Sequence, residues 1–152
     1  MTDYPDELLR GISSKEDVTT EGYASLGAFT FDKHDPERGD DFCEMSINWV
    51  DDEGAVDVLL RQTKIRKGAV QPQFRAGYCR FARATLRNAL DSFFVNGYLS
   101  YERKPLEADE LNPENKYHGN ILLNKDVSKP LKQNIQAALA TLAGPVVRRD
   151  DL

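Results

Sequence analysis

The residues best suited to acid–base chemistry lie in one polar run near the end of the chain. His118 is one of two histidines, and Tyr117 and Asn120 lie beside it in the sequence. A histidine titrates near neutral pH and can act as a general acid or base when a neighbouring group orients it. The alternative, which we favour, is a half-buried histidine whose ring bonds a backbone carbonyl, with Gly119 present for a turn.

Signals for a nucleophile or a metal site are weaker. Cys79 would need a base and an oxyanion site nearby, and a buried unreactive cysteine is the commoner arrangement. His34, His118, Cys43 and Cys79 have no spacing of the C-x₂-C or H-x₃₋₅-H kind, so we predict no metal site and no cofactor. The G-x-S-x-G, P-loop, G-x-G-x-x-G and H-E-x-x-H motifs are also absent from the sequence.

Charge is distributed unevenly along the chain. The net charge is −5, yet residues 58–90 contain eight Lys or Arg and no Asp or Glu, so this segment carries +8 and the remainder −13. The acids are concentrated just upstream, between Asp32 and Asp57. Such segregation favours a partner-binding surface. The residues predicted to form it are Lys64, Lys67, Arg75, Arg80, Arg83 and Arg87.

A protein partner is the interpretation we favour for this surface, and an acidic one would suit it, because complementary charge steers docking and fixes orientation. An alternative is that the basic segment binds nucleic acid. The acidic pI of the chain, about 5.1, argues against this alternative. A third interpretation is a solvated face whose cations pair with the acids of residues 32–57. The sequence leaves a homo-oligomer open.

Length and composition indicate an ordinary globular class. A chain of 152 residues fits one domain, and 40% hydrophobic residues argue against disorder. No apolar run approaches the roughly 20 residues that span a bilayer, and the acidic N-terminus lacks the features of a signal peptide. We therefore expect a cytoplasmic protein with reduced cysteines, no membrane contact, and flexible tails at 1–7 and 146–152.

Hydrophobic periodicity predicts an α+β fold. A strand is predicted at 42–50, because residues 43–49 alternate strictly between apolar and polar side chains, which is typical of a half-buried strand. We expect an antiparallel-dominated sheet of five or six strands with three main helices packed on one side. A capping box from Ser13 to Glu16 predicts a helical turn. The other strands are expected at 8–12, 23–31, 73–81, 98–103 and 117–123, and the helices at 55–66, 82–95 and 129–143.

Several short blocks resemble short bacterial proteins of uncharacterised function. The blocks are Leu8–Ile12, Ser25–Phe29, Phe74–Gly77, and Asn112-Pro113 followed by His118. In that family they run roughly as Leu-Leu-Arg-Arg-Ile, Ser-Ser-Ala-Ala-Phe, Ala-Gly and Asn-Pro-Ala-His-Ala. This chain departs by inserting Lys116-Tyr117 before the histidine and by a long helix after Phe81. The resemblance implies a bacterial origin and a coherent small domain, and it implies no activity.

An enzyme alternative rests on a second resemblance, at the level of pattern. ADP-ribosyltransferase-like domains place an Arg on an early strand, a Ser on the next and a polar group late in the chain, and Arg10, Ser25 and His118 match that order. The resemblance implies that Arg10 would clamp a dinucleotide phosphate and that Ser25 would help hold a nicotinamide ribose. Such domains usually carry a catalytic Glu in an E-x-E motif, and no convincing equivalent is present.

Taken together, these features favour a small bacterial accessory protein of the immunity, regulatory or operon-partner type, acting through its charge-segregated surface. The alternative is a small enzyme acting on a nucleotide-like substrate, with Arg10, Ser25 and His118 as its catalytic residues.

Overall fold

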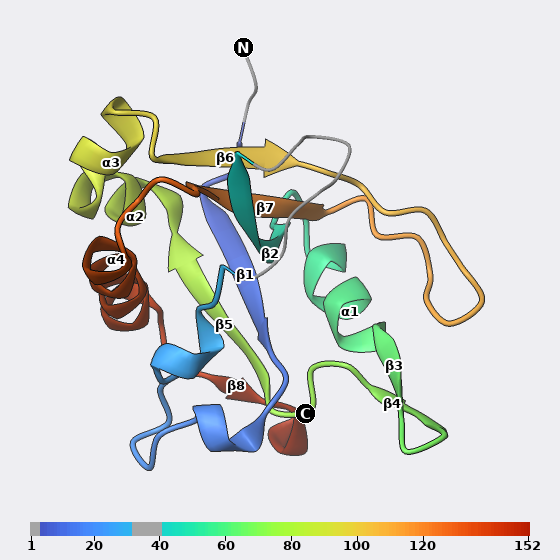
Figure 1. The fold of residues 1–152 in the computed structure, drawn as a ribbon. Coiled ribbons are helices and arrows are strands. Elements are labelled where there is room, and N and C mark those ends of the chain that lie inside the picture. The colour runs from blue at the N-terminus through green and yellow to red at the C-terminus, as the bar shows by residue number, and fades with distance from the viewer. Residues whose placement is uncertain (1–3, 32–40) are drawn as a thin grey trace.

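A computed structural model describes residues 4–31 and 41–152 (Figure 1). Residues 32–40, which include His34 and the first part of the acidic run between Asp32 and Asp57, lie outside the described residues. The strands are β1 (Glu7–Ile12), β2 (Phe42–Trp49), β3 (Thr63–Arg66), β4 (Ala69–Pro72), β5 (Gly77–Ala82), β6 (Leu99–Arg103), β7 (His118–Asn124) and β8 (Val147–Arg148). The helices are α1 (Gly54–Arg61), α2 (Arg83–Ala89), α3 (Asp91–Val95) and α4 (Lys129–Leu142).

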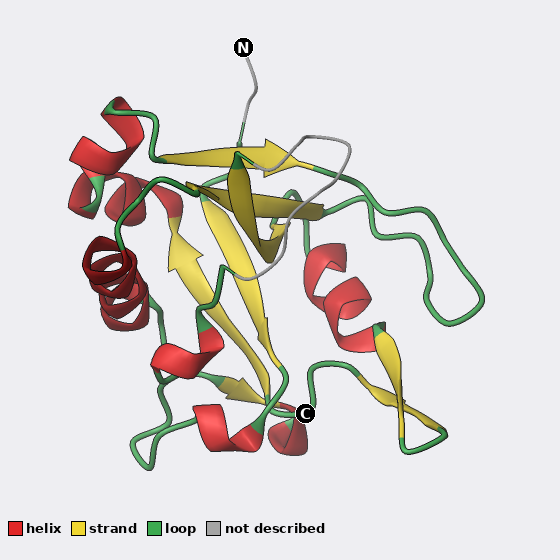
Figure 2. Ribbon diagram, viewed as in Figure 1, coloured by secondary structure: helices red, strands yellow, loops and turns green. Residues whose placement is uncertain are grey.

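The expected α+β fold is confirmed. Six strands form one sheet in the order β6-β7-β2-β1-β5-β8, and β3 and β4 form a separate hairpin (Figures 1 and 2). Every strand pair described is antiparallel. Among the described residues, no helix is both long enough and apolar enough to cross a membrane.

The helices are divided between the two faces of the sheet. Leu8 and Leu9 are neighbours on β1 and therefore point to opposite faces. Leu8 belongs to the larger apolar cluster, together with residues of α2 and α4, so the expected packing on one side holds for these two helices. Leu9 belongs to a smaller cluster that includes Ala55 and Leu59 of α1. The first helix thus covers the opposite face, on the other side of β1 from α4 (Figure 1).

The strand predicted at 42–50 is confirmed as β2, with Met45, Ile47 and Trp49 in the larger core cluster. Its polar side is also covered in part, because Asn48 is buried under the start of α1 and donates from Nδ2 to the Ala55 carbonyl. The strands expected near 8–12, 98–103 and 117–123 are present as β1, β6 and β7.

The strand predicted at 23–31 is wrong. This segment makes one isolated bridge, at Ala24, and a single 3-10 turn over Leu26–Ala28. Phe29 and Phe31 are nevertheless fully buried, and the Gln136 side chain of α4 donates to the Phe29 carbonyl at 2.8 Å. The predicted burial therefore holds for Phe29 and Phe31 but not for Tyr23, which is 47% exposed, and the backbone of the segment is a loop that α4 contacts.

The predicted helix at 55–66 is too long. Helix α1 ends at Arg61, and the next residues form the β3–β4 hairpin. Lys67 and Gly68 have φ of 52° and 77°, so both turn residues adopt the left-handed conformation of a two-residue hairpin turn. The basic residues expected at a helix C-terminus instead belong to this hairpin. The N-cap of α1 is Glu53, whose side chain forms no capping hydrogen bond, while Asp52 Oδ1 accepts from the Gly54 amide at 2.8 Å.

Other boundaries also shift. The helix expected at 82–95 is two helices, α2 and α3, separated at Leu90, and the cap of the first 3-10 turn is Ser14 rather than Ser13. The helix expected at 129–143 is confirmed as α4, with Ser128 as its cap. Within the segment expected as a C-terminal tail, Val147 pairs with Tyr78 of β5.

Candidate functional site

Three of the predicted partner-binding residues, Arg80, Arg83 and Arg87, are paired within the protein. Arg80 lies on β5, within the strand expected at 73–81, and its Nη1 forms an ion pair with Glu7 at 2.8 Å. Arg83 donates to the Pro5 carbonyl at 3.1 Å, and Arg87 pairs with Asp91 at 2.7 Å. The N-terminal segment and α3 therefore supply the partners of these three arginines. These partners differ from the acids of residues 32–57 that the sequence suggested.

The remaining predicted cations are exposed, and two of them belong to the hairpin. Lys64 and Lys67 make no ion pair with the described part of the chain. Arg66 behaves differently, because its guanidinium donates to the carbonyls of Pro72 and Gln73 at 2.7 and 3.0 Å. Arg75 lies outside the hairpin and is also exposed. It lines a shallow hollow together with Ser14 and Glu16.

Arg10 bridges a gap in the sheet. Strands β1 and β2 pair only through Leu8 with Trp49 and Leu9 with Asn48. Beyond that point Arg10 donates from Nη1 to the Ser46 carbonyl at 2.8 Å and from Nε to the Ala28 carbonyl at 2.9 Å. Its guanidinium therefore supplies a hydrogen bond to β2 where the β1 backbone no longer does.

The structure brings two of the three predicted catalytic residues into neighbouring places. Arg10 lines one cavity and His118 lines another, and the two cavities share Gly11, Ser46, Gln73 and Phe74. Ser25 lines neither. It precedes the Leu26–Ala28 turn instead of lying in a strand, and its hydroxyl bonds Asp17 at 3.5 Å.

His118 has the backbone contact expected of the structural interpretation. Its Nδ1 lies 2.8 Å from the Lys104 carbonyl, and because a carbonyl only accepts, Nδ1 carries the proton. Its sequence neighbours bond elsewhere, Tyr117 to Asp52 and Asn120 to Glu102. The side chains of His118, Tyr117 and Asn120 therefore hydrogen-bond to three different parts of the protein.

Gly119 has a packing role rather than the turn role suggested by the sequence. It lies within β7, opposite Ile47 of β2. A Cβ at this position would overlap the indole of Trp49 and the carbonyl of Glu102. The glycine allows the Trp49 indole to cross the strand and donate from Nε1 to that carbonyl at 3.3 Å.

Neither cysteine forms a disulfide, and Cys79 is poorly suited to nucleophilic chemistry. Burial raises the pKa of the Cys79 thiol to about 12, so the thiolate is scarce at neutral pH. In residues 4–31 and 41–152, no group of three or more His, Cys, Asp or Glu side chains is arranged to hold a metal ion.

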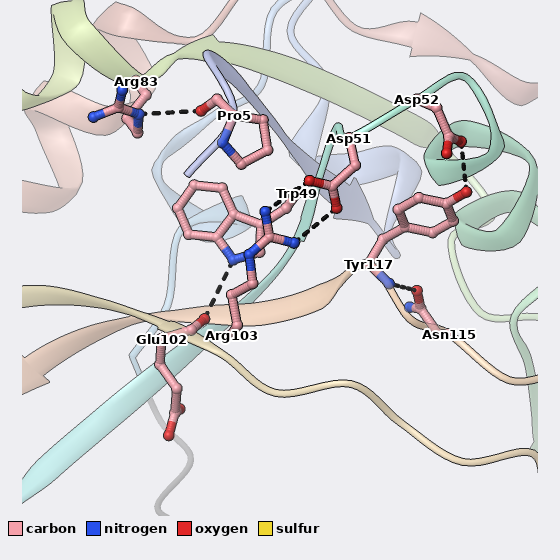
Figure 3. A network of polar contacts seen from close by, with 9 residues as sticks. All are labelled: Pro5, Trp49, Asp51, Asp52, Arg83, Glu102, Arg103, Asn115 and Tyr117. Atoms are coloured by element: carbon pink, nitrogen blue, oxygen red, sulfur yellow. Dashed lines mark hydrogen bonds and ion pairs between the residues drawn. The ribbon is translucent and has the colours of Figure 1, made fainter. Parts of the chain in front are cut away.

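A polar network that the sequence did not reveal lies where β2 leads into α1 (Figure 3). Asp51 accepts two hydrogen bonds from Arg103 of β6, each 2.7 Å long. The neighbouring Asp52 accepts from the Tyr117 hydroxyl at 2.5 Å. These contacts tie the start of α1 to β6 and to the residue before β7. The acid run was predicted only as a helix cap, and the partners lie too far along the chain to be inferred from it.

The network shifts the pKa values of its members. The hydrogen bonds from Arg103 lower the pKa of Asp51, and the hydrogen bond from Tyr117 lowers the pKa of Asp52. The same bond to Asp52 raises the pKa of Tyr117 to about 12. Both carboxylates are therefore charged, and the tyrosine is neutral, at neutral pH.

Acid is expected to weaken the fold through this network. Asp51 and Asp52 have pKa values below 3.8 in the folded protein, so the unfolded chain binds protons first as pH falls. The two carboxylates therefore stabilise the fold fully above the unfolded pKa of 3.8, and this stabilisation is lost as the pH drops through their pKa values in the folded protein. The melting temperature should therefore fall between neutral pH and about pH 2.

Two variants test whether the effect belongs to the network. Asp51→Asn should lower the melting temperature at neutral pH and show a smaller further decrease in acid. Asp151→Asn alters an exposed carboxylate near the C-terminus and should keep the full acid-induced decrease. An Asp51→Asn protein that loses as much stability in acid as the wild type would contradict the assignment.

No family model, curated protein or solved structure matches the chain. The bacterial origin suggested by the short sequence blocks therefore stays a prediction.

Proposed function

We propose that the protein is an accessory interaction module that docks on another protein through the β3–β4 hairpin. One observation carries the proposal: Ile65 and Val70 face each other across the hairpin, and they are 55% and 60% exposed. Lys67 lies in the turn next to this apolar pair, and Lys64, the neighbour of Ile65 on β3, points to the opposite face of the hairpin. An apolar centre with a charged rim is the usual anatomy of a protein-binding patch.

The hairpin is held firmly at its base, which lowers the entropy lost on binding. The Thr63 amide donates to Asn112 Oδ1 at 2.6 Å, and the Thr63 hydroxyl donates to the Leu111 carbonyl at 2.9 Å. Arg66 ties the other strand through the Pro72 and Gln73 carbonyls. A two-stranded hairpin is marginal by itself, so these contacts support a preformed docking element that extends away from the sheet (Figure 1).

The chemistry of the hairpin indicates the kind of partner. Its cations would face carboxylates on the partner, and the Ile65–Val70 pair would fill an apolar depression between them. Attraction between exposed charges is screened by salt, so affinity should fall as ionic strength rises. A partner of this type fits a regulatory, immunity or operon-partner role in the cytoplasm. Nucleic acid is the weaker candidate, because a phosphate backbone is polar and would make no favourable contact with the apolar side chains of Ile65 and Val70.

The proposal is tested with two hairpin variants and a matched control. Ile65→Ser with Val70→Ser removes the apolar pair, and Lys64→Glu with Lys67→Glu reverses the rim. Lys129→Glu with Lys132→Glu makes the same charge change on α4. A protein captured from native cells would be identified by mass spectrometry, purified, and its Kd measured by calorimetry. Each hairpin variant should weaken binding at least about tenfold, or 1.4 kcal/mol, with the control unchanged.

Two results would contradict the proposal. The first is a captured protein that binds both hairpin variants as tightly as the wild type. The second is capture of nucleic acid, seen as excess absorbance at 260 nm in the purified protein together with salt-dependent retention. Melting temperatures close to that of the wild type would show that the hairpin variants are folded.

A further inference from the structure

A cleft opens where β1 and β2 separate. After the Leu9–Asn48 pair, β1 continues alongside β5 while β2 continues alongside β7. Two adjoining cavities of about 250 and 120 Å³ occupy the space between them. Ligand sites commonly measure roughly 300–1,000 Å³, so the joined cleft would suit a ligand near the lower end of that range.

The backbone of β1 faces this cleft at Gly11. The Val50 amide donates to the Glu7 carbonyl, so Glu7 directs its backbone groups towards β2. Alternate residues of a strand present their N–H and C=O groups to the same neighbour, which places the backbone groups of Gly11 on the same side. In the described part of the chain, no β2 residue pairs with Gly11. The cleft wall therefore offers the backbone hydrogen-bonding groups of Gly11, and the Phe74 ring packs on this residue where a Cβ would lie.

The larger cavity has a cationic side. Lys64 and Arg10 both line it, and Lys64 forms no ion pair within the described residues. The hydroxyl-bearing residues Ser13, Thr30 and Ser46 line the same cavity. An ammonium, a guanidinium and hydroxyl groups together are typical of sites that bind phosphate. Glu44 also lines this cavity, and its carboxylate suits the hydroxyl groups of a sugar, which donate.

The smaller cavity combines apolar walls with carboxamides. Leu59, Leu106 and Phe74 line it, and so do Gln62 and Gln73. Gln62 is 7% exposed and uses its Nε2 to donate to the Val58 carbonyl. Within the described residues, its Oε1 and the whole Gln73 carboxamide have no hydrogen-bond partner. Apolar walls with unused amide groups are suited to a flat ring whose edge carries donors and acceptors.

We propose that this cleft binds a small molecule that joins a phosphate to a planar hydrogen-bonding ring, the class of the nucleoside monophosphates. The phosphate lies at the Lys64 and Arg10 side, and the ring lies against Phe74 with its edge facing Gln62 and Gln73. The size of the cleft favours a mononucleotide over a dinucleotide. This site shares Lys64 with the proposed docking surface and does not include the Ile65–Val70 pair, and the inference does not depend on the docking function.

The experiment uses the full chain and four probes, namely adenosine, guanosine, cytidine and uridine monophosphates, with Kd measured by calorimetry and binding mapped by amide NMR. At least one nucleotide should bind with a Kd of millimolar or lower, and the Gly11, Gln62 and Gln73 signals should shift. Ribose 5-phosphate would contact only the phosphate side of the cleft, and the free nucleoside only the side that holds the ring. Each should therefore bind at least about tenfold more weakly than the complete nucleotide.

Two single variants and one control separate the site from the docking surface. Gln73→Leu removes an unused carboxamide and keeps both backbone hydrogen bonds of that residue, whereas Lys64→Ala removes the ammonium. Each should weaken nucleotide binding at least about tenfold with little change in melting temperature. Ile65→Ser with Val70→Ser should leave nucleotide binding unchanged, although it abolishes protein docking.

The inference is overturned if no nucleotide shifts these signals at millimolar concentration, or if Gln73→Leu binds the nucleotide as tightly as the wild type. Binding of ribose 5-phosphate as tightly as the nucleotide would also overturn it, because the ring would then contribute nothing.

Discussion

Gly77→Ala is expected to lower the free energy of unfolding by about 3 kcal/mol, because backbone strain and overpacking each contribute. Gly77 has φ of +129°, a conformation that only glycine adopts readily. A Cβ there would also overlap the Val147 carbonyl and lie 3.1 Å from the Arg148 Cα. Backbone cannot move aside like a flexible side chain, so β8 would have to separate from β5. Urea unfolding monitored by circular dichroism measures the change.

Gly97→Ala is the matched control for this prediction. Gly97 also has a positive φ, of +77°, and among the described residues beyond its two chain neighbours no atom lies within 4 Å of the position a Cβ would take. Its substitution should therefore cost only the strain of the left-handed conformation, about 1–2 kcal/mol. Equal losses in the two variants would mean that contact with β8 adds nothing. In a chain that ends at Val146, the difference between the two alanine variants should disappear.

Asn115→Ala is expected to cost about 2–4 kcal/mol, because each buried polar group left without a partner costs about 1–3 kcal/mol. Asn115 is 2% exposed and donates from Nδ2 to Asn48 Oδ1 at 2.9 Å. Its own Oδ1 accepts from the Tyr117 amide at 3.1 Å. Alanine would leave the Asn48 oxygen and the Tyr117 amide without these partners inside the protein. Thermal and urea unfolding at neutral pH measure the loss.

Glu114→Ala is the control for the amide cluster. Glu114 is the preceding residue and is exposed, so its substitution should change stability by no more than about 0.5 kcal/mol. A loss below about 1 kcal/mol for Asn115→Ala would show that water replaces the missing partners. The 106–116 segment would then be less firmly attached to the sheet than its contacts indicate.

Elements with a strong local signal were predicted well. The alternation of residues 42–50 follows the period of a strand, and Ser128 with Pro130 marks the start of α4. These signals lie within a few residues of the structure they specify. The β3–β4 hairpin was missed because a basic run ending in Gly68 resembles the end of a helix, although Lys67-Gly68 is also a hairpin turn signal.

Elements that depend on distant partners were predicted less well. Residues 23–31 have strand composition, but the segment packs against α4 as a loop. The pairing of Val147 with Tyr78 joins residues far apart in the sequence. Neither outcome follows from local propensity, because strand pairing is decided by which edges remain open after the rest of the chain has folded.

The sequence by itself determined how much charge each segment carries, including the +8 of residues 58–90, because charge is a property of composition. Only the tertiary structure decided which cations are already paired, since pairing depends on distance. It joined Arg80 to Glu7 and Arg87 to Asp91. It left Lys64 at the mouth of a cleft that exists because β1 and β2 follow different partners. Residue types thus set the available chemistry, and long-range strand pairing set where that chemistry converges.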